Sequence, residues 1–127
     1  MVYKILAGLD EVGRGCLAGP VISCALILKK NINRKFIKDS KKITFKDRIK
    51  IAKHIKKNSW YAIGAASVNE IDKYNIFNAT LLSMERAAKK LKKKPHLFLV
   101  DGTHAPKKLK NSRTIIKGDQ KIKCISA

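Results

Sequence analysis

The stretch ILAGLDEVGRGCLAGPV (residues 5–21) carries the clearest structural signal of the chain, because an apolar run ends there in two carboxylates and a glycine-rich turn. A short apolar segment bounded by turn residues is typical of a strand buried on both faces, and we place that strand at residues 2–9. Asp10 and Glu11 follow it, in a chain of 127 residues whose formal net charge is +20. Two adjacent acids at the end of a buried strand, in so basic a chain, therefore indicate a functional site.

The rest of the chain predicts one α/β domain covering residues 1–127. Apolar runs between turn signals predict four more strands, at residues 20–28, 60–68, 97–100 and 113–116. We expect the first three strands of the chain to be antiparallel because short links or one packed excursion join them. A long helix would then make the crossover to the fourth strand.

Two helices are predicted between these strands. Thr44, with Asp47 three residues later, resembles a capping box, and a helix follows to about Asn58. We assign its apolar face to four residues at helical spacing, Phe45, Ile49, Ala52 and Ile55. Asn69 is predicted to cap a second segment, with a helix over residues 74–93. Its apolar stripe consists of Phe77, Leu81, Met84, Ala88 and Leu91.

The composition points to a polyanionic partner. Lys and Arg number 29 against 9 Asp and Glu, and a positive field of this size attracts nucleic acid. A bias of the coding sequence toward lysine would also produce this excess in a protein that binds no nucleic acid. No apolar run approaches the roughly 20 residues that cross a bilayer, and no signal peptide is evident, so we expect a cytoplasmic protein without membrane contact.

The cysteines and histidines give no metal-binding pattern. Cys16, Cys24 and Cys124 form an odd set without CxxC spacing, so we expect reduced, mostly buried thiols. His54 lies off the apolar stripe of its helix and is expected to be in solvent. The other histidines flank the fourth strand without the spacing of metal ligands.

Two separate strands end in the same way. Asp10 ends ILAGLD and Asp101 ends LFLVD, and a glycine follows each within three positions. If these strands are parallel neighbours, the two carboxylates converge at their carboxyl ends, where open α/β sheets bind ligands. Converging, partly buried carboxylates repel unless a cation compensates them, and hard divalent cations prefer oxygen ligands. The pattern therefore predicts a site for Mg²⁺ or Mn²⁺.

Glu11 joins Asp10 at one metal site only if the strand ends first, because successive strand side chains point to opposite faces. Gly13 and Gly15 favour such an ending, and GRG lets the backbone approach a phosphate or hydroxyl closely. The alternative is that Asp10 caps a turn and Glu11 lies in solvent. That alternative loses weight because both strands carry the pattern.

Five motifs in order, LDEVGRGCLAGPV, DSKK, IDKYNI, LVDG and KGD, resemble bacterial ribonuclease HII from Ile5 to the last residue. The resemblance implies an RNase H-like fold, a mixed five-stranded sheet with flanking helices. Cys16 stands where the family more often has Pro. The implied activity is cleavage of the RNA strand of RNA–DNA hybrids, and of single ribonucleotides embedded in duplex DNA, leaving 3′-hydroxyl and 5′-phosphate ends.

The resemblance also assigns roles to residues. Asp10, Glu11 and Asp101 correspond to catalytic carboxylates that bind Mn²⁺ or Mg²⁺ in a two-metal displacement. Six further positions correspond to nucleic-acid contacts: Gly13, Arg14, Gly15, Lys41, Asn75 and Lys117. The first three would sense the 2′-hydroxyl, and the others would hold the backbone. Simple solvation is the alternative for Lys41 and Lys117, and Asp119 belongs to the turn after KG.

The chain ends at KCISA, where the family continues into helices that carry a fourth catalytic Asp and a Tyr near the scissile ribonucleotide. We therefore expect the carboxy-terminal helices to be missing, one sheet face to be exposed and the metal cage to be incomplete. The expected result is an inactive or nearly inactive polypeptide, unless a complementing carboxy-terminal fragment supplies the remainder.

Three functions stay open at this point. The leading hypothesis is an endoribonuclease of the ribonuclease HII type. The second is an inactive remnant that still binds hybrid or duplex nucleic acid through its basic surface. The third, a small basic structural protein of a ribonucleoprotein particle, gives the carboxylates and the glycine turn no purpose.

Overall fold

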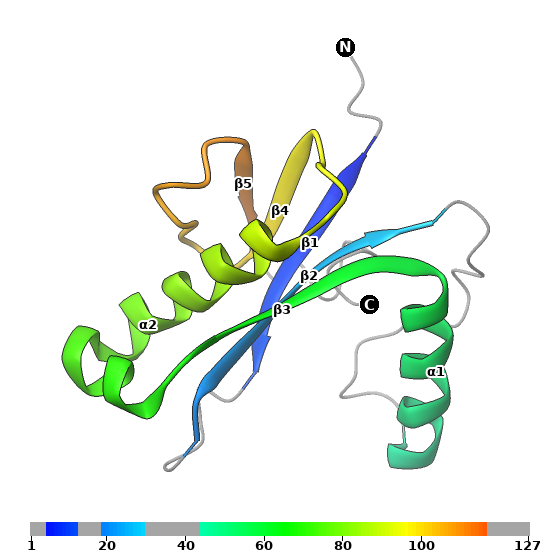
Figure 1. Ribbon diagram of the computed structural model, residues 1–127, viewed down its shortest axis with the longest axis horizontal. Helices are drawn as coiled ribbons and strands as arrows, with labels where there is room; N and C mark the ends of the chain where they lie inside the picture. The colour runs from blue at the N-terminus through cyan, green and yellow to red at the C-terminus, as the bar shows by residue number, and fades with distance from the viewer. Residues whose placement is uncertain (1–4, 13–18, 30–43, 117–127) are drawn as a thin grey trace.

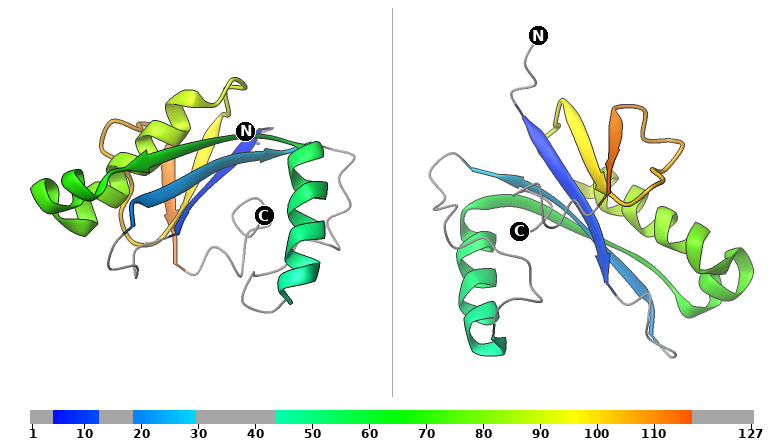
Figure 2. Two further views of the ribbon diagram at one scale, coloured as in Figure 1. Left: turned by 60° about the horizontal axis from the view of Figure 1, so that its bottom comes forward. Right: turned by 180° about the vertical axis from the view of Figure 1, so that it is seen from behind.

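The computed structural model describes residues 5–12, 19–29 and 44–116, which form one mixed sheet with a helix on each face (Figures 1 and 2). The elements, in chain order, are β1 (Leu6–Val12), β2 (Val21–Leu28), α1 (Phe45–Lys57), β3 (Ser59–Ala66), α2 (Val68–Lys90), β4 (Leu97–Asp101) and β5 (Ser112–Ile115). The five strands lie in the order β3-β2-β1-β4-β5. The α/β fold class predicted from the sequence is confirmed.

The strand directions also agree with the prediction. β1 pairs antiparallel with β2, and β2 antiparallel with β3. β4 pairs parallel with β1 on one side and with β5 on the other. α2 connects β3 to β4 and is the crossover that the parallel pairing requires. β1 therefore lies at the centre of the sheet, between an antiparallel and a parallel neighbour.

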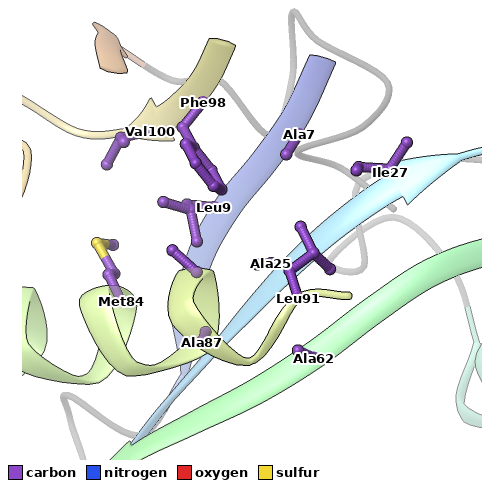
Figure 3. Packing of buried hydrophobic residues seen from close by; sticks show 11 residues of the cluster. Ala7, Leu9, Ala25, Ile27, Ala62, Met84, Ala87, Leu91, Phe98 and Val100 are labelled. Atoms are coloured by element: carbon purple, nitrogen blue, oxygen red, sulfur yellow. The ribbon is translucent and has the colours of Figure 1, made fainter. Parts of the chain in front are cut away.

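The main core lies between α2 and the sheet (Figure 3). Alternate residues of each strand point to the same face, and small and large apolar side chains from four strands meet the helix there. The buried members are Ala7, Leu9, Ala25, Ile27, Ala62, Met84, Ala87, Ala88, Leu91, Phe98 and Val100. The predicted stripe of α2 is confirmed at Met84, Ala88 and Leu91, whereas Phe77 is 41% exposed.

α1 packs on the other face of the sheet, and its predicted stripe is confirmed at Ile55 but not at Phe45 or Ile49. Ile55 is buried against Leu26, and Ile51 packs beside it, while Phe45 is 73% and Ile49 44% exposed. The sheet meets the helix near its carboxyl end, so the contact falls on the i and i+4 pair Ile51 and Ile55. Helical spacing alone did not show which of two apolar stripes the sheet would cover.

α2 begins earlier than predicted. Ser67, rather than Asn69, is the N-cap, and it forms a reciprocal capping box with Glu70. Asn75 interrupts the helix with a φ of 70°, and its side-chain oxygen accepts a hydrogen bond of 3.0 Å from the Asn78 N–H. The start predicted at residue 74 thus marks the second segment of a kinked helix, because Asn75 caps that segment.

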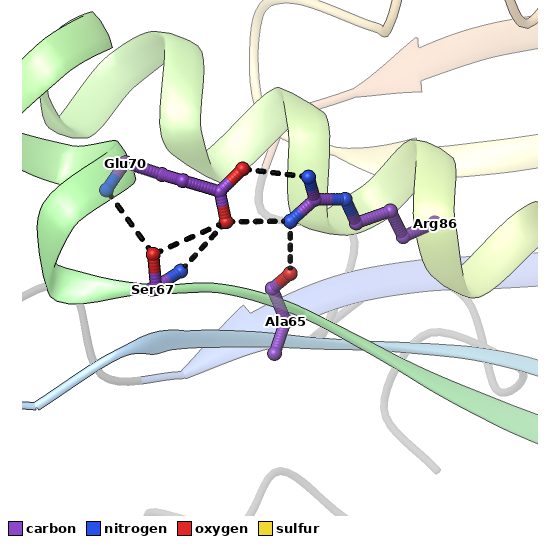
Figure 4. A network of polar contacts seen from close by, with 4 residues as sticks. All are labelled: Ala65, Ser67, Glu70 and Arg86. Atoms are coloured by element: carbon purple, nitrogen blue, oxygen red, sulfur yellow. Dashed lines mark hydrogen bonds and ion pairs between the residues drawn. The ribbon is translucent and has the colours of Figure 1, made fainter.

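An ion pair holds the first segment of α2 to its second segment and to β3 (Figure 4). The two guanidinium nitrogens of Arg86 donate to the two carboxylate oxygens of Glu70 at 2.7 and 2.6 Å, and Nη1 also donates to the carbonyl of Ala65 at 2.8 Å. Arg86 and the Ser67 backbone lower the pKa of Glu70 to about 2. The stabilisation from this carboxylate is present above pH 4.5 and is lost as the pH falls toward 2.

Neither helix in the described part of the chain has the length and apolar character needed to span a membrane.

The close contact of α2 with the sheet depends on a glycine. A Cβ at Gly64 would overlap the backbone of Ser83 and Ala87, so only a residue without a side chain lets β3 and α2 approach this closely. Both obstructing groups are backbone atoms of one helix, and they cannot move aside separately.

We expect Gly64→Ala to lower the free energy of unfolding by about 1–3 kcal/mol, because the added methyl group forces α2 away from β3. Ala65→Ser, an exposed change at the next residue of the strand, is the matched control and should stay within about 0.5 kcal/mol of the original. Urea unfolding followed by far-UV circular dichroism measures both. Equal stability of the two variants would show that the contact at Gly64 is not tight.

Candidate functional site

The parallel pairing of β1 and β4 brings two carboxylates together. Leu9 pairs with Val100 in this register, and Asp10 and Asp101 are the next residues of their strands. Both side chains are half-buried, and a hydrogen bond links their carboxyl groups. The convergence of Asp10 and Asp101 that the sequence predicted is therefore present at the carboxyl ends of two adjacent strands.

Asp10 carries the strongest electrostatic perturbation of the site. Burial raises its pKa to about 7, and repulsion from Asp101 and Glu11 adds to the rise. The Glu11 N–H donates to Asp10 Oδ1 at 2.8 Å, which partly offsets these effects by favouring the charged form. Near neutral pH the Asp10 carboxyl is therefore poised between its protonated and charged forms.

Glu11 lies on the other face of the sheet from Asp10. β1 continues to Val12, beyond the end predicted at residue 9, so side chains still alternate at Glu11. Glu11 pairs with Ser23, whose side chain meets Ser83 of α2 at 2.5 Å. The expectation that the strand ends before Glu11 is wrong, and the residues described here contain no group of three acidic, histidine or cysteine side chains that could hold a metal.

Cys24 is the neighbour of Asp10 on β2. The pKa of its thiol is raised to about 11, mainly by burial and also by the charge of Asp10, while Lys56 acts in the opposite direction. The thiol therefore stays protonated at neutral pH, which does not suit a nucleophile. Cys24 is a free, half-buried thiol, as the sequence predicted for it.

The chain leaves Asp101 through a turn that contacts α2. Gly102 has a φ of 125°, a conformation that favours glycine, and His104 then packs edge-on against Phe77 with ring centroids 5.0 Å apart. Phe77 lies just after the kink at Asn75. No sequence pattern predicts this contact, because Phe77 and His104 belong to different motifs and share no periodicity.

The other predicted site residues are only partly covered by the structure. Asn75 is exposed, and its side chain caps the second segment of α2. Six positions lie outside the described residues: Gly13, Arg14, Gly15, Lys41, Lys117 and Asp119. His54 is half-buried and contacts the Asn58 side chain at 3.4 Å, so the prediction of a solvated histidine is wrong.

The donor chemistry of the pair fits a hard divalent cation. Carboxylate oxygens are the ligands that Mg²⁺ and Mn²⁺ prefer, and a cation between Asp10 and Asp101 would offset the repulsion that burial intensifies. Asp10 must lose its proton to bind the cation, so affinity is expected to rise as the pH passes about 7.

Comparison with known proteins identifies a consistent set of relatives. A family model described as Ribonuclease HII matches residues 7–127. The Ribonuclease HII of Pelagibacter ubique is 56% identical over 126 residues, which cover 98% of this chain and 67% of that protein. The Ribonuclease HII of Thermotoga maritima is 46% identical over 125 residues, which cover 98% of this chain and 51% of that protein.

The solved structures agree with these sequences. The ribonuclease H2 from Pyrococcus horikoshii OT3 matches with a TM-score of 0.82 at 27% identity, over 96% of this chain and 67% of that one. The chain spans about half to two thirds of the length of the curated relatives named above. Sequence and fold comparisons thus point to the same family.

We expect Asp10→Asn to raise the free energy of unfolding at pH 8, without divalent cations, by about 1–3 kcal/mol after allowance for solvent screening. Because the folded state raises the pKa of Asp10, its favourable contribution is complete below pH 3.8 and is lost as the pH rises through about 7. The increase in the free energy of unfolding caused by Asp10→Asn should therefore grow between pH 4 and pH 8.

Urea unfolding in EDTA across this pH range measures the effect. Asp72→Asn, a change at an exposed aspartate of α2, is the matched control for the loss of one negative charge. A difference between Asp10→Asn and the original that does not change with pH would contradict the repulsion between the two carboxyl groups.

Proposed function

This chain belongs to the ribonuclease HII family, and we propose that it hydrolyses the RNA strand of RNA–DNA hybrids and single ribonucleotides embedded in duplex DNA. The products would be 3′-hydroxyl and 5′-phosphate ends. The observation that supports this proposal most directly is the pairing of Asp10 with Asp101 at the carboxyl ends of two parallel strands. The cytoplasmic location inferred from the sequence stays a prediction.

Asp10 and Asp101 would hold the divalent cations, Mg²⁺ or Mn²⁺, that this chemistry needs. Bound cations would supply a water that ionises near neutral pH and a positive charge beside the departing 3′-oxygen. Burial and the nearby carboxylates destabilise the charged form of Asp10. A bound cation would relieve this repulsion, so the charged Asp10 would bind a cation more readily than a solvated carboxylate. The Glu11 N–H fixes the orientation of the Asp10 carboxyl group through its hydrogen bond.

The substrate would lie across the sheet face that carries Asp10, beside α1. Four exposed lysines follow the helical spacing of α1, namely Lys46, Lys50, Lys53 and Lys57. α1 packs on the same face as Cys24, and Lys56 lies near enough to act on the pKa of that thiol. Positive charge on the helix that covers this sheet face suits a phosphate backbone, which such contacts position without reading sequence.

Recognition of the ribonucleotide is assigned to Gly13, Arg14 and Gly15, which follow β1 and the two acids in sequence. The 2′-hydroxyl is the group that distinguishes a ribonucleotide from a deoxyribonucleotide. Lys41, Asn75 and Lys117 are proposed as backbone contacts, and for Asn75 that contact would have to use the exposed side of the kink in α2.

We expect the polypeptide of 127 residues to act slowly when tested alone. Two carboxylates leave most positions around a six-coordinate cation to water, and each missing preorganised ligand costs orders of magnitude in rate. If no cleavage occurs under any condition while hybrid still binds, the chain is a binding protein instead.

The decisive experiment uses duplex DNA with one embedded ribonucleotide and either Mn²⁺ or Mg²⁺. We expect metal-dependent nicking on the 5′ side of the ribonucleotide, reduced about 10²-fold or more in Asp10→Asn and in Asp101→Asn. Denaturing gels with end-labelled strands measure the rate and identify the ends.

Asp72→Asn is the control for charge and should retain the original rate. A readout besides activity is thermal unfolding, because Mn²⁺ should raise the Tm of the original chain and not that of Asp10→Asn. Nicking that survives both active-site changes would show that a contaminating nuclease, or a different site, is responsible.

A further inference from the structure

A second basic surface surrounds the side chain of Trp60, which is 41% exposed at the start of β3. The ammonium of Lys29 lies 5.0 Å from the centroid of the indole, and that of Lys93 lies 5.9 Å from it. Both distances are within the range of cation–π attraction. We call Trp60, Lys29, Lys92, Lys93 and Lys94 the Trp60 patch.

Within residues 5–12, 19–29 and 44–116, no lysine of the patch forms an ion pair with a carboxylate. Among the lysines from Lys89 to Lys94, only Lys89 has a carboxylate partner within the described part of the chain, Glu85 at 2.8 Å. Lys92, Lys93 and Lys94 are exposed and consecutive, directly after the residue that ends α2. Their charges therefore add to that of Lys29.

The patch lies at the other end of the sheet from the carboxylate pair. β4 begins at Leu97, shortly after Lys94, and ends at Asp101. At about 3.3 Å per strand residue, these ends are about 13 Å apart along the strand. Lys93 follows α2, which covers the face opposite to Asp10. The proposed catalytic site cannot account for this surface.

The physics of the patch favours a particular ligand. Both ammonium groups lie within 6 Å of one ring centroid, so at most about 11 Å separates them, a distance similar to the Debye length of about 10 Å at 0.1 M salt, and they repel each other most at low salt. A polyanion would relieve that repulsion. A base can stack on the exposed indole once a lysine ammonium moves from the ring to a phosphate, and single-stranded nucleic acid supplies both spaced phosphates and accessible bases.

We propose that the Trp60 patch binds single-stranded nucleic acid, with phosphates on the lysines and a base on the indole. Duplex DNA offers the same phosphates but keeps its bases stacked in pairs, and an acidic peptide or an anionic membrane offers no base. The proposal goes beyond the cleavage activity, because it needs neither the carboxylate pair nor a metal ion.

Trp60 is the only tryptophan in the sequence, so its fluorescence reports on the patch directly. The probe is a twelve-nucleotide oligothymidylate, titrated into the protein in EDTA at several salt concentrations. We expect quenching of the emission on binding. Trp60→Leu, followed by anisotropy of a labelled oligonucleotide, should weaken binding roughly 5- to 100-fold through the loss of base stacking.

Matched controls separate stacking and local charge from general effects. Tyr61→Leu removes a similarly exposed aromatic side chain, 42% exposed, from the next residue of β3, and should leave the affinity unchanged. The slope of the logarithm of the binding constant against the logarithm of the salt concentration measures the phosphate contacts. The triple variant Lys92→Gln, Lys93→Gln and Lys94→Gln should make this slope less steep by about 2. Lys107→Gln, Lys108→Gln and Lys110→Gln remove the same charge from exposed positions elsewhere and should change it less.

The outcomes are distinct from those of the cleavage test. Asp10→Asn should bind the oligonucleotide like the original chain even if it never cuts, so loss of one activity does not imply loss of the other. Equal affinity of Trp60→Leu and Tyr61→Leu would overturn the proposal. The proposal would also be overturned if duplex DNA, polyglutamate or phosphatidylserine vesicles bound as tightly as the oligonucleotide and lost as much affinity in Trp60→Leu.

Discussion

The parallel pairing of β1 with β4 is the contact on which the candidate site depends. It aligns two strands that are distant in sequence so that Asp10 and Asp101 follow the last paired residues side by side. Neither carboxylate has an unusual environment in its own segment, because each simply ends an apolar run. Their proximity arises when α2 carries the chain across the sheet and returns β4 to the centre beside β1.

The rest of the fold supports that pairing against its electrostatic cost. Two neighbouring acids in a partly buried position oppose folding, as the raised pKa of Asp10 shows. The core beneath α2 compensates, since small residues let the helix approach the sheet closely and Gly64 lets the two backbones touch. The ion pair between Glu70 and Arg86 then joins both segments of the kinked helix to β3. The main core thus lies on the α2 face, and Asp10 and Asp101 lie on the other face of the sheet.

Local patterns predicted much of this arrangement. The two Asp-terminated runs indicated both the parallel strands and the meeting of Asp10 with Asp101, because strand ends and turn residues are local properties. The same reasoning failed where the answer depended on neighbours. Side-chain alternation could not place Glu11 until the end of β1 was known, and the spacing of α1 could not show that Ile51 would face the sheet in place of Ile49.

Four properties follow directly from the amino-acid sequence: the α/β order of elements, the basic charge, the acidic strand ends and the resemblance to one enzyme family. These properties reside in single segments or in composition, so they can be read without coordinates. Only the tertiary structure decided that Glu11 turns away from Asp10, that Asn75 caps a kinked helix and that two lysines from distant segments share the ring of Trp60. Each of these depends on where separate segments meet in space, and packing between them sets that geometry.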